Sequence, residues 1–516
     1  MQNRFTARLV GVVLATLASI SHLPAAEIGA AKEGGTGLKK EDRQPTPQVA
    51  PASKEAESNL KRIHVPEGLK LDLWAAEPML ANPVAFCLDE HGRVFVSETY
   101  RYRTSALDIR HYMFMIEDDL AARHVDDRIA YSKKWFGDKF NDLNIETEVV
   151  RVLEDRTGSG MANFSAIYAD KFNSPLDGIA SGTLARKGKV YFANIPAVWE
   201  LSGMDKDGHA TARQQMSSGY GVRYSFTGHD LHGLIIGPDG KLYFSFGDRG
   251  ANVKTKEGKT LAFPDEGGVF RCNLDGSELE VVYRGLRNPQ ELAFDNYGNL
   301  FTGDNDFDHG DEERLVYIVE GGDSGWRVGY QHAPLGFDLV AWKSEHIWMN
   351  HESRQADYNG KEIKNRTADT GIRSPAYLKP ISNIGDGPSG FAFNPGVVAL
   401  PAKFDGKFFL CHFKGSIGNS KIQTFRVRPS GAGFTLADSE EFVTQCQPTD
   451  VDFGPDGAVY FSDWGEGWER TKKGRIYRVY DERLKNSVEV LATKKLIGEG
   501  MDRHSDGELV KLLAHR

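Results

Sequence analysis

The sequence contains few cysteines, no long hydrophobic run beyond its first residues and no excess of basic charge. The four cysteines, Cys87, Cys272, Cys411 and Cys446, form no CxxC or CxxCH pair, which excludes covalently attached c-type haem and simple zinc ribbons. No later apolar stretch reaches the about 20 residues that span a bilayer, so we expect no transmembrane segment in the mature chain. The formal charge of −9 gives no basic footprint, and no nucleic-acid partner is expected.

The first 26 residues have the features of a secretory signal peptide. Arg4 and Arg8 precede the apolar run 9–20, and residues 23–26 (LPAA) offer a small-residue cleavage site. The apolar run is shorter than the about 20 residues that a membrane anchor needs. We therefore expect export to the periplasm or the extracellular space.

One pattern recurs six times between residues 59 and 482: an apolar strand, a polar turn and a second strand of β-branched and aromatic residues. A single small sheet cannot bury both of its faces, so such repeats stack around an axis. The sequence therefore predicts an all-β fold, a six-bladed β-propeller with helical insertions and a short C-terminal helix. Each repeat has a glycine in its turn, and these glycines are Gly92, Gly188, Gly240, Gly298, Gly406 and Gly457.

Two intervals between the repeats are long. Residues 104–143 mix charged residues with Met, Phe and Ile in a pattern typical of helices, and residues 335–367 are dense in His, Trp, Asn and Tyr. Long loops on a rigid scaffold are often lids or specificity elements.

The segments on either side of the repeats differ in composition. Residues 27–58 are rich in Lys, Glu, Gly, Pro and Ala without apolar periodicity, which predicts a disordered linker. Residues 483–516 are expected to be helical, and 506–516 read as a capped amphipathic helix. Because one short helix is marginally stable alone, we expect this segment to begin a helical, HEAT-like module that is lost or encoded separately.

Polar residues precede the first strand of every repeat. The innermost strands of a propeller all run in one direction, so these residues should meet at one end of the central channel. They include Asn82, Asp177, His229, Arg287 and Ser389. A base, a cation and hydrogen-bonding groups in one concavity make a candidate site. The alternative is that the Asn-Pro and Pro-Asp-Gly elements only cap strands and turns.

Two short segments carry the strongest candidates. His229 and His232, flanked by glycines, would place titratable nitrogens at the mouth, where a histidine can remove a hydroxyl proton near neutral pH. Arg287 and Asn288 could stabilise developing negative charge or clamp a carboxylate. The alternatives are a structural histidine and an inter-blade salt bridge.

An acidic loop follows the fourth repeat. Its oxygen-bearing side chains suit a hard cation such as Ca²⁺, although the EF-hand order is absent. A solvated acidic loop is the alternative. The candidate metal ligands are Asp304, Asp306, Asp308, Asp311, Glu312 and Glu313.

Three motifs match a known family. Residues 234–250 (LIIGPDGKLYFSFGDRG), 285–290 (GLRNPQ) and 320–326 (EGGDSGW) resemble the soluble quinoprotein glucose/sorbosone dehydrogenase family. The similarity spans residues 63–480. Residues 65–70 (VPEGLK) and the final helix extend this resemblance. With them, the chain resembles the propeller part of large exported planctomycete and verrucomicrobial proteins that are similar to membrane-bound dehydrogenases.

This resemblance implies pyrroloquinoline quinone (PQQ) at the mouth, with Ca²⁺, and hydride transfer from a sugar carbon to the quinone. It implies His229 as the base and Arg287 and Asn288 as the quinone-contacting pair. Electrons would pass to an external acceptor such as a cytochrome c. The implied cofactor-binding residues are Lys414, Arg287, Asn288, Gln290 and His232. The candidate substrate-binding residues are Asp177, Asp248, Gln447 and Thr449. Gln447 and Thr449 lie near the positions where the family has blade-six arginines that bind cofactor carboxylates.

The leading hypothesis is thus a PQQ- and calcium-dependent dehydrogenase that oxidises a sugar or an alcohol. A second hypothesis is a non-catalytic propeller that binds glycans or a protein through the same mouth. A third is a calcium-dependent, lactonase-like hydrolase in which acidic residues hold the metal and His229 activates water.

Overall fold

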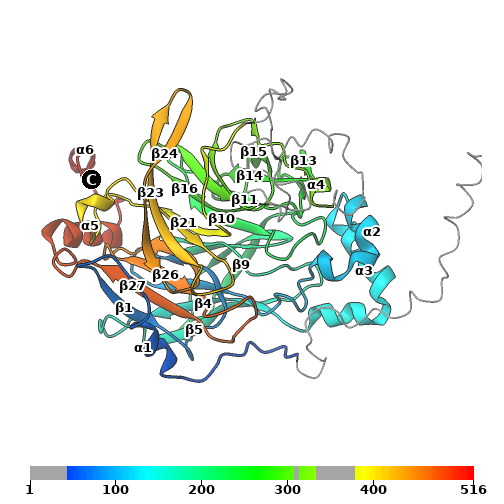
Figure 1. The fold of residues 1–516 in the computed structure, drawn as a ribbon, viewed down its shortest axis with the longest axis horizontal. Coiled ribbons are helices and arrows are strands. Elements are labelled where there is room, and N and C mark those ends of the chain that lie inside the picture. Colours follow the sequence, from blue (N-terminus) through cyan, green and yellow to red (C-terminus); the bar gives the residue numbers. More distant parts are fainter. Residues whose placement is uncertain (1–42, 307–312, 333–377, 516) are drawn as a thin grey trace, which may run out of the picture.

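The computed structural model describes residues 43–306, 313–332 and 378–515. Its strands, many of them labelled in Figure 1, form six sheets of four or five strands. Neighbouring sheets contact each other through their first strands in a closed ring. The predicted all-β, six-bladed propeller is confirmed.

Five blades follow the order of the chain, each with its first strand innermost. The first blade contains β2 (Pro83–Leu88), β3 (Val94–Glu98), β4 (Glu148–Glu154) and β5 (Phe164–Phe172); the second contains β6 (Thr183–Arg186), β7 (Lys189–Asn194), β8 (Ala197–Ser202) and β9 (Ala212–Ser218). The third contains β10 (Leu231–Ile236), β11 (Leu242–Phe246), β14 (Gly267–Cys272), β15 (Glu280–Leu286) and the short parallel strand β19 (Gly322–Asp323). The fourth contains β16 (Pro289–Phe294), β17 (Leu300–Asp304), β18 (Arg314–Ile318) and β20 (Ser382–Asn383), and the fifth contains β21 (Pro388–Phe393), β22 (Phe408–His412), β23 (Lys421–Ser430) and β24 (Gly433–Thr444).

The sixth blade is assembled from both ends of the domain. β25 (Pro448–Phe453), β26 (Val459–Asp463) and β27 (Arg475–Tyr480) come from its end, and β1 (Lys70–Ala75) comes from its beginning. β1 pairs antiparallel with β27, with Lys70 opposite Tyr480 and Leu71 opposite Val479. These backbone hydrogen bonds close the ring.

The six turn glycines all lie between the first and second strands of a blade. Their φ angles are positive, from 65° at Gly406 to 81° at Gly92. Side chains with a Cβ rarely adopt this conformation, which explains the recurrence of glycine in each turn. The sequence pattern therefore located all six blades.

The insertion after β3 is helical, as predicted. It contains the 3-10 turns η2 (Ile109–His111), η3 (Met113–Met115) and η4 (Gly137–Asn144) and the helices α2 (Ile116–Ala121) and α3 (Val125–Phe136). Its apolar residues, Ile109 and Met115 among them, pack with Tyr224 and Phe226 of the third blade. The predicted loop 335–367 lies outside the described residues.

The segment before the propeller differs from the prediction. The predicted disordered linker is wrong for residues 43–58, which lie against the propeller and include the start of α1 (Glu55–Asn59). Arg43 Nε donates to Glu146 Oε1 at 2.6 Å, and the Ala50 amide donates to the Lys472 carbonyl at 2.7 Å. Polar contacts hold this segment, so its lack of apolar periodicity was misleading. The predicted signal peptide and residues 27–42 lie outside the described residues.

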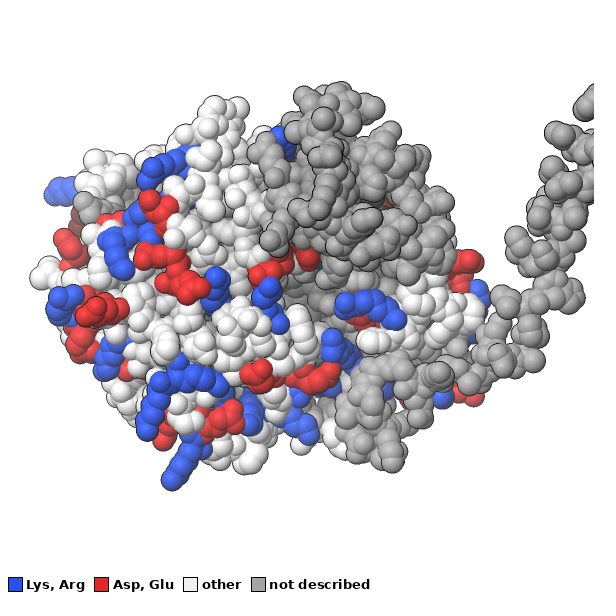
Figure 2. All heavy atoms as spheres, in the orientation of Figure 1, with Lys and Arg blue, Asp and Glu red and all other residues white. Residues whose placement is uncertain are grey.

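The remaining elements are short. They are the hairpin β12 (Ala251–Lys254) and β13 (Thr260–Phe263), α4 (Gly329–His332), the 3-10 turn η8 (Ala402–Phe404), α5 (Val488–Glu499) and α6 (Asp506–Leu512). α6 begins with a capping box of Ser505 and Glu508, where the sequence predicts a capped helix. Among the described residues, no helix has the length and apolarity to cross a membrane. Acidic and basic side chains are interspersed on the face in Figure 2.

The inner strands approach closely at the axis, which gives a test of the packing. A Cβ added at Gly390 on β21 would lie 2.3 Å from the Asp450 Cα on β25. We expect Gly390→Ala to lower the free energy of unfolding by about 1–3 kcal/mol, the usual cost of overpacking. Gly418→Ala is the matched control, because a Cβ there has no neighbour within 4 Å. Equal midpoints of chemical unfolding for the two variants would contradict this packing.

Candidate active site

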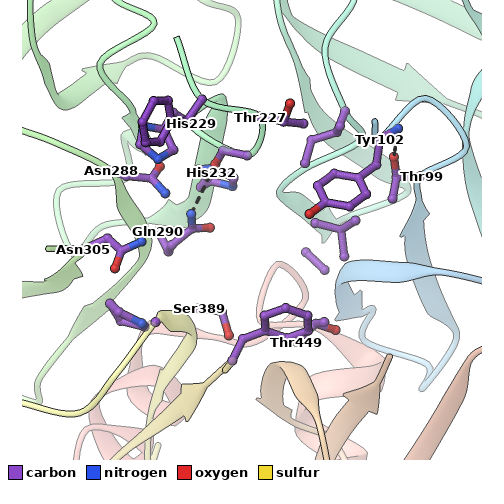
Figure 3. A pocket seen from close by; sticks show the side chains of 18 of the residues that line it. Thr99, Tyr102, Thr227, His229, His232, Asn288, Gln290, Asn305, Ser389 and Thr449 are labelled. Atoms are coloured by element: carbon purple, nitrogen blue, oxygen red, sulfur yellow. Dashed lines mark hydrogen bonds between the residues drawn. The ribbon is translucent and has the colours of Figure 1, made fainter. Parts of the chain in front are cut away.

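A cavity of about 450 Å³ opens at the end of the channel where the loops before the inner strands meet. The same end receives the loops that follow the second strand of each blade, because the first two strands are antiparallel. Figure 3 shows His229, Asn288, Gln290 and Asn305 on one side of the cavity and Tyr102 on the other. The predicted convergence of polar groups at one mouth is present.

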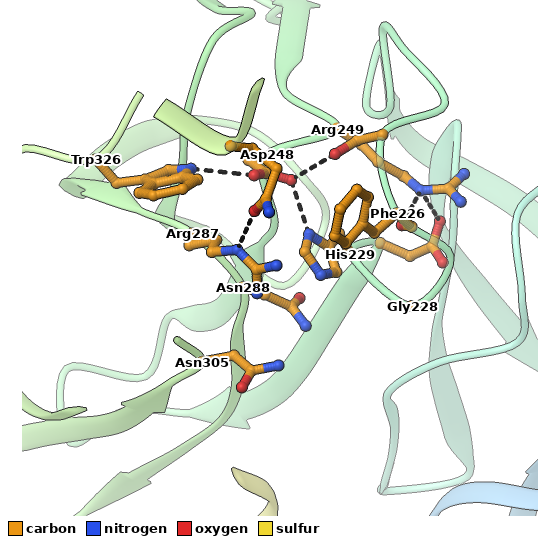
Figure 4. A network of polar contacts seen from close by, with 12 residues as sticks. Phe226, Gly228, His229, Asp248, Arg249, Arg287, Asn288, Asn305 and Trp326 are labelled. Carbon is orange, nitrogen blue, oxygen red and sulfur yellow. Dashed lines mark hydrogen bonds and ion pairs between the residues drawn. The ribbon is translucent and has the colours of Figure 1, made fainter. Parts of the chain in front are cut away.

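His229 lies in the loop before β10, and the carboxylate of Asp248 holds its ring in place. His229 Nδ1–H donates to Asp248 Oδ1 at 2.8 Å (Figure 4). Asp248 also accepts from Ser225 Oγ at 2.8 Å and from Trp326 Nε1 at 3.0 Å. Because Nδ1 is engaged by Asp248, Nε2 is the nitrogen of this ring that can act as a base. His229 lines the cavity.

The electrostatics favour a neutral His229 beside an ionised Asp248. Burial lowers the pKa of His229 below its usual value, and this effect outweighs the neighbouring Asp248 charge, which raises that pKa. Burial alone would raise the pKa of Asp248, but His229, Arg287 and Ser225 together lower it to about 2. A neutral imidazole on a charged carboxylate is the protonation state of a general base.

Arg287 and Asn288 lie next to His229 on the segment that leads into β16. Asp304 Oδ1 accepts from the backbone amides of both, at 3.0 and 2.8 Å, which fixes the course of the chain. Arg287 Nε donates to Gln331 Oε1 at 2.9 Å. Asn288 Oδ1 is buried and has no hydrogen-bond partner among the described residues. Its lone pairs can therefore serve a donor on a bound molecule.

His232 and Gln290 stabilise the loop that contains His229. His232 Nε2–H donates to the Gly228 carbonyl at 2.9 Å, and Gln290 Nε2 donates to the same oxygen at 3.3 Å. Burial lowers the pKa of His232 to about 4, so its ring is neutral. Both residues line the cavity, but these contacts fix the position of the residue before His229.

The helical insertion supports the His229 loop, a role that the sequence did not reveal. The Ile109 amide donates to the Ser225 carbonyl at 2.9 Å, and Asp108 Oδ2 accepts from the Thr227 amide at 3.1 Å. Asp119 Oδ1 accepts from the Tyr224 amide at 2.7 Å. In the sequence, both aspartates look like ordinary members of an amphipathic pattern.

Four predicted ligand-binding residues lie elsewhere than expected. Lys414 does not line the cavity and forms an ion pair with Asp386. Asp177 accepts from the Ser174 amide at 2.9 Å, outside the cavity lining, and Gln447 Nε2 donates to the Gly467 carbonyl at 2.7 Å. Asp248 is fully buried behind His229, so it positions the ring and cannot contact a substrate. Of the four candidate substrate-binding residues, only Thr449 lines the cavity.

The acidic loop does not form the predicted metal site in its described part. Asp304 is fully buried, and its Oδ2 accepts from Arg314 Nη2 at 2.8 Å. Glu313 Oε1 accepts from the Gly387 amide at 2.7 Å. In the described ranges, which include Asp306, no cluster of three or more His, Cys, Asp or Glu side chains could hold a metal ion. Asp308, Asp311 and Glu312 lie outside the described residues.

Several lining residues were not predicted at all. Asn305, Tyr102, Phe413, Trp464 and Trp468 all follow the second strand of a blade. The predicted convergence of polar groups was based on the loops before each first strand, and among the loops after second strands only the acidic loop and the one that contains Lys414 were named. Counting the loops after each second strand would have included these residues.

The fold and the mouth define a six-bladed propeller with a histidine–aspartate pair in its central cavity. The chain belongs to the family described as a domain of unknown function (DUF7133), whose pattern matches residues 55–483. It is also similar to quinoprotein glucose dehydrogenase B of Acinetobacter calcoaceticus, with 35% identity over 148 residues, covering 22% of this chain and 30% of that protein. The HIPL1 protein of Arabidopsis thaliana is 29% identical over 132 residues, covering 20% of this chain and 19% of that protein. The chain thus matches less than a third of the length of either curated relative.

Solved structures with similar folds include two aldose sugar dehydrogenases. The PQQ-bound form from Streptomyces coelicolor is 15% identical, with a TM-score of 0.45, covering 81% of this chain and 99% of that one. The apo form from Escherichia coli is 14% identical, with a TM-score of 0.46, covering 80% of this chain and 100% of that one. The likeness to quinoprotein glucose dehydrogenases that the motifs predicted is confirmed.

The His229–Asp248 pair predicts a titration that can be measured. In the folded protein the ring pKa of His229 should lie below 6.5, so the ring should remain neutral at pH 7. Asp248→Asn removes the charge that raises this pKa, and the pKa should fall further. Imidazole chemical shifts from NMR, followed against pH, report both values. An unchanged or increased pKa in Asp248→Asn would show that the pair does not interact as described.

Proposed function

We propose that the chain is a dehydrogenase that oxidises a CH–OH group of a sugar or an alcohol, with PQQ as the hydride acceptor. The observation that carries this proposal is the hydrogen bond between His229 and Asp248, with His229, Arg287 and Asn288 lining one cavity. The Acinetobacter relative is a quinoprotein glucose dehydrogenase, which supports the choice of cofactor.

The cavity has groups that fit PQQ, which is a planar quinone with carboxylate groups. Arg287 lines the cavity and can interact with a carboxylate or with a quinone oxygen. Arg103 and Arg110 also line the cavity, where they form ion pairs with Glu469 and Asp108. The buried Asn288 Oδ1 can accept from an N–H group. When bound, PQQ supplies a two-electron acceptor for the hydride, a reaction that no side chain of the protein can perform.

His229 is the proposed general base. Its Nε2 would accept the hydroxyl proton of the substrate while the hydride leaves the carbon that bears this hydroxyl group. Asp248 would stabilise the imidazolium that forms, because its charge lies 2.8 Å from Nδ1. The guanidinium of Arg287 would stabilise negative charge that develops on the acceptor. The proton would then leave His229 through the open mouth to solvent.

Calcium is not part of this proposal. Among the predicted ligands that the structure describes, Asp304 forms an ion pair with Arg314 and Glu313 Oε1 accepts from the Gly387 amide. No step is therefore assigned to a calcium ion.

The proposal also covers the roles of the other segments of the chain and the electron acceptor. Residues 1–26 would direct export, residues 59–482 would form the catalytic propeller, and residues 483–516 would form a separate helical segment. The sequence contains no CxxCH motif, so electrons would have to pass to an external acceptor such as a cytochrome c. Dye acceptors can replace this partner in an assay.

Replacing the base tests the proposed function. With PQQ and an aldose, the wild-type protein should reduce a dye, and His229→Gln should lower kcat by about 10²-fold or more, the usual contribution of a general base. Binding of PQQ should persist in the variant, seen as a cofactor-dependent rise in Tm.

His91→Gln is the control, because this exposed histidine lies in the turn between β2 and β3, at the opposite end of the blade. It should retain wild-type turnover. If the wild-type protein shows neither turnover nor a PQQ-dependent Tm shift, the dehydrogenase proposal is wrong. Equal turnover in His229→Gln and wild type would remove His229 from the mechanism.

A further inference from the structure

One wall of the cavity is a continuous row of aromatic rings. Tyr102 comes from the first blade, Phe413 from the fifth, and Trp464 and Trp468 from the loop between β26 and β27 of the sixth. Adjacent rings meet edge to face: Tyr102 with Trp464 at 6.1 Å, Phe413 with Trp464 at 6.2 Å and Phe413 with Trp468 at 5.2 Å between centroids. This geometry fixes each ring by its neighbour.

Trp468 is the exposed end of this row. Its side chain is 47% exposed, and it is the one exposed tryptophan in the described part of the chain, whereas Trp464 is buried. Such exposure of a large apolar ring on a cavity rim is typical of a binding surface.

The exposed ring is nevertheless held in place. Gly415 provides the space for the indole, since a Cβ at this glycine would lie 2.1 Å from Trp468 Nε1. On one side of Trp468, Gln447 Nε2 donates to the Gly467 carbonyl at 2.7 Å, and on the other, Glu469 forms an ion pair with Arg103 at 2.6 Å. A ring held in this way loses little conformational entropy when a ligand binds to it.

The opposite side of the cavity is polar. His229, Asn288, Gln290 and Asn305 lie across from Tyr102 in Figure 3. A ligand that contacts both sides must present an apolar face to the aromatic rings and hydroxyl groups to the amides and the imidazole. A sugar ring has this character, since its axial C–H groups form one apolar face and its hydroxyl groups lie around the edge.

We infer that Trp468 is the platform of a second sugar subsite and that the substrate is a glycoside of at least two rings. Trp468 belongs to the sixth blade and His229 to the third, and these blades face each other across a six-bladed ring. A ligand with one ring at His229 therefore has to extend across the mouth to reach Trp468. This inference rests on the proposed function for the position of the reacting ring, but not for the binding of sugar to Trp468.

Steady-state kinetics with cellobiose, maltose and glucose test the subsite. Stacking on an aromatic ring contributes up to about 1.5 kcal/mol, so Trp468→Ala should raise the ratio of the disaccharide KM to the glucose KM by about 10-fold. Trp468→Phe, which keeps a ring, should raise the ratio less. Tyr297→Ala is the matched control, because Tyr297 is an exposed aromatic residue in the turn between β16 and β17, and it should leave the ratio unchanged. An unchanged ratio in Trp468→Ala would overturn the inference.

Calorimetric titration of cellobiose and maltose into His229→Gln separates this inference from the proposed function, because the measurement needs no turnover. Binding that weakens about 10-fold on adding Trp468→Ala supports the subsite even if no aldose is oxidised by the wild-type protein. Disaccharide binding that is unaffected by Trp468→Ala, or no binding of either disaccharide, would overturn the subsite even if glucose is oxidised.

Discussion

The structure depends on the closure of the ring by β1 and β27, which joins the beginning of the propeller to its end. The cavity lies at the inner side of the ring, where the sixth blade meets the first. Thr449 Oγ1 of the sixth blade donates to the Pro83 carbonyl of the first at 3.0 Å, and Asp450 Oδ2 accepts from the Phe86 amide at 2.7 Å. The aromatic wall crosses the same interface between the sixth and first blades, because Tyr102 packs against Trp464. The site therefore depends on the contact between these two blades.

On the opposite side of the mouth, a chain of buried polar contacts connects the helical insertion to the reactive group. Asp108 and Asp119 bind backbone amides of the segment 224–227, and Gly228 and His229 follow directly. His232 and Gln290 hold the Gly228 carbonyl, and Asp248 holds the ring. Buried polar groups with satisfied hydrogen bonds define one conformation and are costly to disturb. The imidazole is consequently positioned before any substrate binds, as catalysis by a general base requires.

The sequence was sufficient for the architecture because its repeat has a local physical cause: each turn needs a glycine at positive φ, and each strand pair has its own apolar pattern. It also identified His229, Arg287 and Asn288 at the mouth. It failed for Lys414 and Asp304, since ion pairs between residues distant in the chain or across a sheet decide where a charged side chain points. Trp468 and Asp119 were missed because their roles arise only when loops from different blades come together. Residues 43–58 show the same limit, since polar contacts rather than apolar periodicity hold them.

The central claim is that the mouth of this propeller holds one PQQ next to His229 and reduces it with a hydride from a sugar. A single-turnover experiment tests this claim most directly: the protein is loaded with PQQ, mixed with cellobiose in the absence of any electron acceptor, and the quinone absorbance is followed. We expect reduction of one PQQ per chain, and slower reduction when the carbon that loses the hydride carries deuterium. Bound PQQ that stays oxidised in the presence of cellobiose, maltose and glucose, or a protein that binds no PQQ, would contradict it.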